Sequence, residues 1–451
     1  MQENTQLKKV LTPLHLWALA VGLVISGEYF GWNLGWQTSG AVGMMVATLI
    51  VTVLYITFIF SFTELTASIP HAGGPFAYSY RALGPIGGFI AGYATLVEFL
   101  IAAPAIAVAL GTYMNFLYPS LDIKLTACAC YLVFTGINLL GIKESAQFNL
   151  FVTLLAIIEL CIFMGITGPH FKWANFSANP MPHGVEGVFH AMPFAIWLYV
   201  AIEGVAMVAE EVKNPRKNIP KGYIYGILTL AVLAIGVMLC AGGISDWQLL
   251  SATDKPLPDA ISLVLGKSNT LTHLFAGIGL FGLIASFHSI ITGYSRQIFA
   301  LGRSGYLPTA MASVNKRFQT PHWALIVGGL TGVITIYSFN TDSIITLSVI
   351  GALVMYIISM ISLFILRKRE PNQDRPFTVP FYPWFPAVAL GLSLVGLAAI
   401  AWYYAALTAI FFGSLIVFGL VFVLTGKHKQ KLDDTVLQSA EPATASIPDR
   451  V

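Results

Sequence analysis

The chain contains about twelve stretches of roughly 20 apolar residues that few charged side chains interrupt. A helix of that length crosses the roughly 30 Å hydrocarbon core of a bilayer. Of the 451 residues 56% are hydrophobic and only 10% are charged, whereas a soluble domain carries about 25% charged residues. Such an apolar excess cannot be buried in a water-soluble core. The sequence therefore predicts a membrane protein, and its net charge of +3 is too small to indicate a nucleic-acid partner.

The apolar stretches are continuous, which favours helices over barrel strands, because barrel strands alternate in polarity and are about 10 residues long. We therefore predict an all-α polytopic membrane protein of about twelve transmembrane helices. The first stretch lacks a small-residue cleavage site and is expected to be retained as helix one. The expected spans are 13–38, 41–68, 84–117, 125–142, 147–168, 185–208, 221–243, 271–301, 322–339, 343–366, 383–403 and 405–425.

Basic residues are distributed unevenly between the two sets of alternating loops, and Lys and Arg accumulate on the cytoplasmic side of a membrane. Twenty of the 24 fall on one side or at a helix end beside it, and the other side holds only Lys124, Lys172, Lys255 and Lys267. This bias predicts a multi-pass protein of the cell (inner) membrane with both termini in the cytoplasm. An even number of crossings agrees with that orientation.

The polar segments and the cysteines complete the predicted organisation. Residues 1–12 are expected to form a cytoplasmic N-terminus, 13–425 the twelve-helix membrane domain, and 426–451 a disordered cytoplasmic tail. The stretch from Asp246 to Pro258 has the composition of a loop. The cysteines lie in apolar helices, where a thiol behaves as a small hydrophobe, so neither a disulfide nor a metal site is expected; they are Cys128, Cys130, Cys161 and Cys240.

Four glutamates lie well inside the predicted spans, and no lysine lies at that depth. A charge at the bilayer centre costs roughly 3 kcal/mol on insertion scales, so each such residue is a functional hypothesis. Three explanations stay open: protonated carboxyls that bridge helices, carriers of protons, or ligands of a cationic solute. The acids are Glu28, Glu98, Glu159 and Glu203. The candidates for proton coupling are Glu159, Glu203, Glu98 and His288.

Two of these acids stand beside a glycine in the middle of a span, in Ser26-Gly27-Glu28 and in Glu203-Gly204. Glycine permits a helix to break at mid-membrane, and broken helices expose backbone groups to a substrate in transporters. Both acids lie about two-thirds of the way along helix one and helix six. This correspondence suggests two five-helix repeats of inverted topology, about 13–168 and 185–366, followed by two additional helices at 383–425.

Three segments on the basic side resemble those of the amino acid, polyamine and organocation permease family. They are Ile69-Pro-His-Ala-Gly-Gly-Pro-Phe-Ala-Tyr-Ser-Tyr-Arg81 with Gly84-Pro-Ile-Gly-Gly-Phe-Ile-Ala-Gly92, then Glu210-Glu-Val-Lys-Asn-Pro-Arg-Lys-Asn-Ile-Pro220, and Tyr294-Ser-Arg-Gln with Ala300-Leu-Gly-Arg-Ser-Gly-Tyr-Leu-Pro308 and Thr320-Pro321. The resemblance covers nearly the whole chain up to about residue 425. It implies a LeuT-like fold of five plus five helices, in which helices one and six are unwound at the substrate site and access alternates between the two sides.

The resemblance also places residues in the substrate site. Ser26 and Gly27 match a Gly-Ser-Gly stretch whose amides hold the carboxylate of an amino acid, but Ile25 replaces the first glycine and Glu28 follows. A fixed carboxylate there would repel the substrate's own by about 4 kcal/mol at about 4 Å in an effective dielectric of 20. This favours an amine that lacks the acid group. The expected substrate-binding residues are Ile25, Ser26, Gly27, Glu28, Tyr29, Trp197, Ala201, Glu203 and Gly204.

Two aromatic features of this set have open interpretations. Trp197 matches a position that closes over substrate in some relatives, and its ring face also suits a cation, although simple packing explains it too. Tyr29, Trp32 and Trp36 are either cavity lining or anchors at the lipid interface.

The run Ile25-Ser-Gly-Glu-Tyr-Phe-Gly-Trp32 is most similar to the ethanolamine permease branch. The expected function is import of ethanolamine or a closely related small amine by a secondary active transporter, with coupling to protons or exchange; sodium is left open, and no cofactor is expected. The alternative is an amino acid permease of the same fold. A non-transporting amine receptor or an enzyme fits less well, because the chain has no signalling domain and no catalytic constellation. Membrane lipid is an expected partner, and the oligomeric state is left open.

Overall fold

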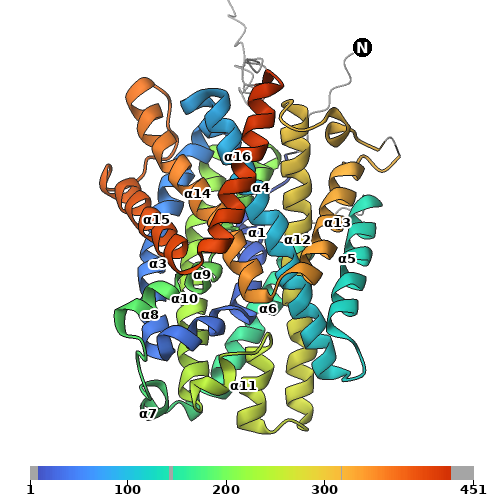
Figure 1. Cartoon of the computed structure of the whole chain (residues 1–451), viewed down its shortest axis with the longest axis vertical. Coiled ribbons are helices and arrows are strands. Elements are labelled where there is room, and N and C mark those ends of the chain that lie inside the picture. Colours follow the sequence, from blue (N-terminus) through green and yellow to red (C-terminus); the bar gives the residue numbers. More distant parts are fainter. Residues whose placement is uncertain (1–8, 142–145, 316, 428–451) are drawn as a thin grey trace, which may run out of the picture.

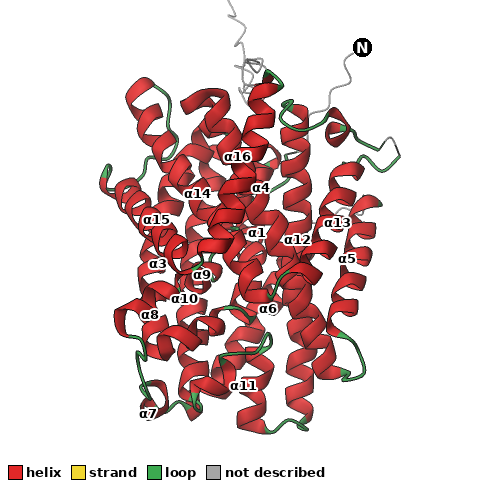
Figure 2. Cartoon of the chain, viewed as in Figure 1, coloured by secondary structure: helices red, strands yellow, loops and turns green. Residues whose placement is uncertain are grey.

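The structure is a computed structural model that describes residues 9–141, 146–315 and 317–427. Within these ranges the regular elements are helices, together with one isolated bridge between Leu11 and Val212. The helices run side by side as a bundle (Figures 1 and 2). By length and composition, nine helical segments of the described chain can cross a membrane. The prediction of a polytopic all-α membrane protein is confirmed.

The helices follow the expected spans closely. The first half contains α1 (Pro13–Val24), α2 (Ser26–Tyr29), η1 (Trp32–Gly35), α3 (Trp36–Ser68), α4 (Pro75–Leu117), α5 (Ile123–Leu139) and α6 (Ala146–Thr167). A connection follows with η2 (Gly168–His170), α7 (Trp173–Phe176) and α8 (Gly184–His190). The rest contains α9 (Met192–Trp197), η3 (Ile202–Glu211), α10 (Pro215–Gly243), η4 (Trp247–Leu250), α11 (Pro256–Leu265), α12 (Thr270–Arg303), η5 (Thr309–Ala312), α13 (His322–Ser338), α14 (Thr341–Arg369), α15 (Trp384–Tyr403) and α16 (Ala405–Leu424).

Three boundaries differ from the expectation for identifiable reasons. Helix α4 extends back to Pro75, but its backbone leaves the helical region at Gly84 (φ 74°), where the expected span begins. Helix α3 is kinked in the same way at Gly40 (φ 66°). Only glycine adopts such angles at low cost, so both glycines set the start of a straight segment. The expected loop from Asp246 to Pro258 was wrong at its end, where Pro256 begins helix α11 as a first-turn proline.

Helices one and six lie in the interior of the bundle. Helix α1 packs against α10, α6 and α12, while α4 and α14 pack against each other through the centre. By contrast, α16 buries only Phe411 and Phe422 and presents Ile416, Val417 and Leu424 outward, as expected for a lipid-facing helix. The broken helices therefore lie where other helices enclose them on all sides.

Both described ends of the chain lie at the same end of the bundle. The backbone N–H groups of Val10 and Leu11 donate to Glu211 O at 2.9 and 3.1 Å, and Arg296 near the end of α12 holds the Glu211 carboxylate at 3.1 Å. Lys427, after α16, donates to Leu307 O, also just beyond α12. We call this end the terminal end. Its assignment to the cytoplasm stays a prediction, and the predicted tail from residue 428 lies outside the described residues.

Candidate functional site

Helix one is interrupted near the predicted position, and its backbone departs furthest from helical geometry a few residues later. Helix α1 ends at Val24 and the short α2 follows after Ile25, and the backbone leaves the right-handed region at Phe30, which is extended (φ −162°, ψ 166°), and Gly31 (φ 96°). Side chains bond the freed backbone groups: Asn33 Oδ1 accepts from Gly31 N at 3.1 Å, and Trp32 Nε1 donates to Glu28 O at 3.0 Å. Helix α1 therefore ends beside the expected Ser26-Gly27-Glu28, but the non-helical backbone lies at Phe30 and Gly31 rather than at Gly27.

Gly27 has a different role, which is close contact between helices one and six. A Cβ atom at this position would lie 2.6 Å from Trp197 O. Because that neighbour is a backbone atom, it cannot move aside in the way that a flexible side chain does. The two helices thus approach each other backbone to backbone in this state.

Helix six is interrupted between α9 and η3, ahead of the expected Glu203-Gly204 position. Residues 198–201 are not helical in the regular sense, and Ala201 is left-handed (φ 77°), a conformation that L side chains rarely adopt. The Ala201 N–H, freed by the break, donates to Glu98 Oε1 at 3.3 Å. Glu98 therefore extends from α4 to the point where helix six is interrupted. Gly204 serves packing, since a Cβ there would lie 2.9 Å from the Phe99 ring.

A small cavity lies between the two broken helices. Three of the expected substrate residues, Ser26, Trp197 and Ala201, help to line it, with Leu23, Val24, Ala102, Ile106, Val200 and Ile290. Its volume is about 10 Å³, which is about the space of one water molecule. The other six expected residues are not part of its wall; they are Ile25, Gly27, Glu28, Tyr29, Glu203 and Gly204. In this state the centre is closed around a space too small for a solute.

Glu28 is completely enclosed, with 0% of its surface exposed. Neither carboxylate oxygen has a hydrogen-bond partner among the described residues. Buried polar groups in proteins are almost always hydrogen-bonded, and a buried charge without a partner is costly. Glu28 is therefore a carboxyl group that still needs a proton or a cation.

Glu159 on α6 is fixed by the segment that precedes the break in helix one. The Tyr29 hydroxyl donates to Glu159 Oε2 at 2.7 Å, and the Tyr113 hydroxyl donates to Tyr29 O at 3.2 Å. Gly282 leaves room for the Tyr29 ring, since a Cβ there would lie 2.7 Å from its hydroxyl. Tyr29, like Trp32 and Trp36, is fully buried, so the alternative of a lipid-interface anchor is wrong for all three.

Glu98 and Glu203 lie in contact at the break in helix six, with their carboxyl groups at hydrogen-bonding approach. Besides the contact with Ala201, the pair receives the Tyr356 hydroxyl, which donates to Glu203 Oε2 at 3.3 Å. Glu98 Oε2 and Glu203 Oε1 have no partner among the described residues. The sequence placed both acids at membrane depth without indicating that they meet.

His288 is directed away from these acids. Its Nδ1 lies 3.1 Å from Asn138 Nδ2 on α5, and its ring packs on Phe134. Two residues earlier, on the other side of α12, Ser286 contacts helix one: its hydroxyl lies 2.8 Å from Ser26 Oγ and donates to Leu23 O at 2.8 Å. Ser286 was not among the predicted site residues, since a single serine in an apolar helix gives no distinguishing signal.

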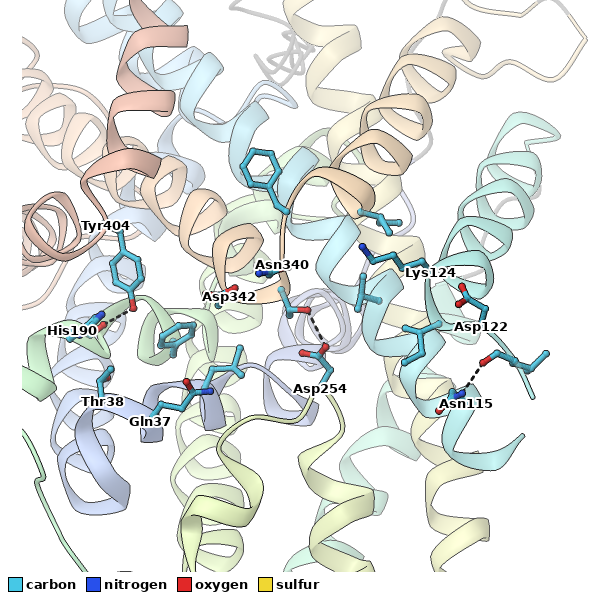
Figure 3. Close-up of a pocket in the computed structure, with 18 residues that line it drawn as sticks. Gln37, Thr38, Asn115, Asp122, Lys124, His190, Asp254, Asn340, Asp342 and Tyr404 are labelled. Carbon is cyan, nitrogen blue, oxygen red and sulfur yellow. Dashed lines mark hydrogen bonds between the residues drawn. The ribbon is translucent and has the colours of Figure 1, made fainter. Parts of the chain in front are cut away.

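A large cavity of about 900 Å³ opens at the end of the bundle opposite the terminal end. It is lined by the outer halves of helices one and six through Leu34 and Phe194, and by polar residues that Figure 3 labels. Among these, Asp254 accepts from Thr341 Oγ1 at 3.1 Å. Burial, with a smaller contribution from Asp342, raises the pKa of the Asp254 carboxyl, against the effect of the Thr341 hydrogen bond.

The terminal end, by contrast, is closed by contacts between the segments that flank helices one and six. The backbone bonds of Val10 and Leu11 to Glu211 join the start of helix one to the end of helix six, and Lys213 N donates to Leu11 O at 2.9 Å. A closed centre with an open cavity on one side and a closed gate on the other is the arrangement of an alternating-access transporter.

Comparisons with known proteins agree with that class. Residues 11–432 match the model of the family described as amino acid permease, and the chain belongs to this family of transporters. It is 28% identical to an uncharacterized transporter of Rhizobium meliloti, over 86% of this chain and 85% of that one. It is 26% identical to the branched-chain amino acid permease BcaP of Bacillus subtilis, over 94% of each chain. It is 27% identical to the methylthioribose transporter of Bacillus subtilis, over 87% of this chain and 88% of that one.

Proposed function

We propose that this transporter imports ethanolamine or a closely related small amine, and that Glu28 holds the ammonium group of the solute. The observation that carries the proposal is the Glu28 carboxyl, which is fully enclosed next to the break in helix one and has no hydrogen-bond partner among the described residues. A carboxylate at membrane depth is expensive unless a positive charge compensates it. An ammonium group supplies that charge together with three hydrogen-bond donors.

The surroundings of Glu28 suit an amine better than an amino acid. The Glu28 amide already donates to Ile25 O at 3.0 Å, so it is engaged within helix one. A substrate carboxylate beside Glu28 would meet a like charge. The hydroxyl groups of Ser26 and Ser286 are suitable partners for the hydroxyl of ethanolamine, and the Trp197 ring is a surface on which a cation is stabilised by up to about 2 kcal/mol.

Binding requires the two broken helices to separate. The central cavity holds about one water molecule, and Glu28 is not in its wall. Movement of Gly27 away from Trp197 O would widen the cavity toward Glu28, because these two groups now touch backbone to backbone. The solute enters from the side of the 900 Å³ cavity and leaves at the terminal end, which we place in the cytoplasm, when the contact between Leu11 and Val212 opens. Protons or exchange drive the cycle, with sodium as the alternative ion.

An amino acid permease is the second candidate, and two observations favour it. Glu28 is absent from the wall of the closed cavity, as expected if it does not contact solute. One similar protein is named for branched-chain amino acids and another for aromatic amino acids. The relative named for methylthioribose shows that similar chains also carry other solutes.

Uptake into proteoliposomes tests the proposal directly. Labelled ethanolamine is offered with and without an imposed pH gradient, and unlabelled amines or amino acids compete in parallel. Competition by amines alone supports the proposal, whereas uptake of alanine or leucine without binding of ethanolamine contradicts it and supports the amino acid permease.

The variant Glu28→Gln tests the role of the carboxylate. Hydrogen bonds to charged groups contribute about 1.5–3 kcal/mol, so ethanolamine affinity should fall about 10- to 150-fold. Glu370→Gln is the matched control, because this carboxylate lies in a partly exposed ion pair with Arg81. Unchanged ethanolamine affinity in Glu28→Gln would refute the assignment of Glu28.

A further inference from the structure

The acid pair at the break in helix six has an incomplete set of hydrogen bonds. Glu98 is 0% and Glu203 1% exposed, and their carboxyl groups touch. One oxygen of each has a donor, namely the Ala201 N–H for Glu98 Oε1 and the Tyr356 hydroxyl for Glu203 Oε2. The remaining oxygens, Glu98 Oε2 and Glu203 Oε1, have none among the described residues. The two acids therefore touch while each still has one oxygen without a donor.

One proton is enough to complete this arrangement. A proton on either carboxyl group is donated to the other, which gives both free oxygens a partner. Without it, two negative charges touch inside the membrane, and like charges at such separation cannot both be ionised at low cost. With one hydrogen already joining the two groups, a second proton is not needed to give either free oxygen a partner.

The groups that face the pair do not supply a positive charge. Tyr55 from α3 bonds the Tyr356 hydroxyl of α14 at 2.8 Å, and Tyr223 from α10 donates to Glu203 O at 3.0 Å. From α14, Ser348 donates to Glu98 O at 2.9 Å. Within the described chain these neighbours are neutral, and no lysine, arginine or histidine contacts either carboxyl group.

We propose that Glu98 and Glu203 share a single proton, and that this proton is the one coupled to transport. The inference rests on the transport function proposed above for its coupling part, but the shared proton itself does not depend on the solute. The coupled step is release of the proton from the pair to water at the open side, which leaves two carboxylates in contact. Their repulsion separates η3 from α4 at Ala201, the residue on which helix six bends, and protonation restores the contact.

Infrared difference spectroscopy on the purified full-length protein tests the shared proton without any solute. We expect the pair to contribute one protonated-carboxyl band, and we expect Glu98→Gln and Glu203→Gln each to abolish it. In each variant the amide N–H₂ takes the place of the proton, and the remaining carboxylate is ionised. If each acid instead carries its own proton, either substitution leaves the band of its partner, and that result overturns the proposal.

Two further series keep the spectroscopic test decisive. Glu159→Gln changes a buried acid outside the pair, so the band of the pair should persist in that variant. If the glutamine variants do not fold, Glu98→Asp and Glu203→Asp retain both carboxyl groups. If the two acids share one proton, each aspartate variant should show a single protonated-carboxyl band at a shifted frequency. Two separate protonated-carboxyl bands from the pair in either variant would overturn the proposal.

Transport measurements test the coupling. In proteoliposomes the Glu98→Gln variant should keep solute-for-solute counterflow, while accumulation driven by a pH gradient falls by about tenfold or more in both glutamine variants. Labelled ethanolamine and labelled alanine are followed in parallel. If only alanine shows counterflow, ethanolamine is not the substrate. The role of the Glu98 and Glu203 pair is then still tested with alanine as the solute. Gradient-driven accumulation that survives in both variants overturns the coupling role, whichever solute is carried.

Discussion

Glu64, near the terminal end of α3, and Glu28, at the centre of the bundle, are buried to the same degree, with 1% and 0% of their surfaces exposed. Arg367 donates to both carboxylate oxygens of Glu64 at 2.6 Å. Arg375 Nε lies 3.3 Å from Glu64 Oε1, and Val379 N donates to Glu64 Oε2 at 2.8 Å. Glu28 has no such partner within the described chain. Burial alone therefore does not indicate what a carboxylate does. A complete set of partners marks a structural acid, and an incomplete set marks a candidate for function.

The largest effect is expected from Glu64→Met. This change leaves Arg367 and Arg375 without their carboxylate, and breaking a buried ion pair by removing one partner costs about 3 kcal/mol. The thermal unfolding midpoint of the purified protein in detergent should fall clearly. Glu370→Gln, in the more exposed pair with Arg81, should cost less than about 1 kcal/mol. If the two variants lose equal amounts of thermal stability, Glu64 does not have the structural role that distinguishes it from Glu28.

A smaller loss of thermal stability is expected from Gly27→Ala, which changes the residue next to Glu28. The added methyl group would lie 2.6 Å from Trp197 O, and overpacking against rigid atoms costs about 2 kcal/mol. The closed state should be disfavoured, and counterflow should weaken along with thermal stability. Gly165→Ala on α6 is the control, since a Cβ there meets no atom within 4 Å. A Gly27→Ala protein as stable as this control would show that the centre is more loosely packed than the structure indicates.

A gain in thermal stability, rather than a loss, is expected from Glu28→Met. An unbranched apolar side chain of similar length removes two unpaired buried oxygens, and replacing such groups contributes about 1 kcal/mol of stability. Uptake of ethanolamine should disappear in the same protein. Thermal unfolding and uptake are measured on one preparation beside Glu64→Met. If Glu28→Met is destabilised as strongly as Glu64→Met, the two acids do not differ in the way we describe.

The smallest effect concerns Asp254, a third acid, which lies in the outer cavity. Burial raises its pKa above the usual value of 3.8, so the folded protein holds this proton more tightly than the unfolded chain does. Stability should therefore decrease as pH rises from about 4 through the raised pKa. Asp254→Asn should remove this part of the pH dependence of the unfolding midpoint. A pH profile identical to that of the unsubstituted protein would show that Asp254 does not titrate in this way.

Much of the fold was predictable because lipid imposes one requirement on every span. The expected span 322–339 is helix His322–Ser338, and 343–366 lies within Thr341–Arg369. The breaks were misplaced by a few residues. Glycine content shows where a chain is able to bend, but Gly31 bends whereas Gly27 packs, and this choice depends on what the neighbouring helix requires. At the second break an alanine, Ala201, adopts the left-handed conformation, which no sequence rule selects.

The acids illustrate the same limit. Glu64 was not singled out by its sequence, because it lies near a predicted helix end, and its partner Arg367 is 303 residues away. Glu98 and Glu203 were both identified as candidates, but their contact and the proximity of Tyr356 depend on how α4, η3 and α14 pack. His288, equally deep by sequence, instead bonds Asn138 on a peripheral helix.

By itself the sequence determined that this protein is a helical bundle in a membrane, with acids but no lysine at membrane depth, because hydrophobic length and the cost of buried charge depend on local composition. Only the tertiary structure decided which acids have partners, where helices one and six break, and which end of the bundle is closed. Hydrogen bonds and ion pairs act over a few ångströms between residues that are hundreds of positions apart, so they form only once the chain is packed.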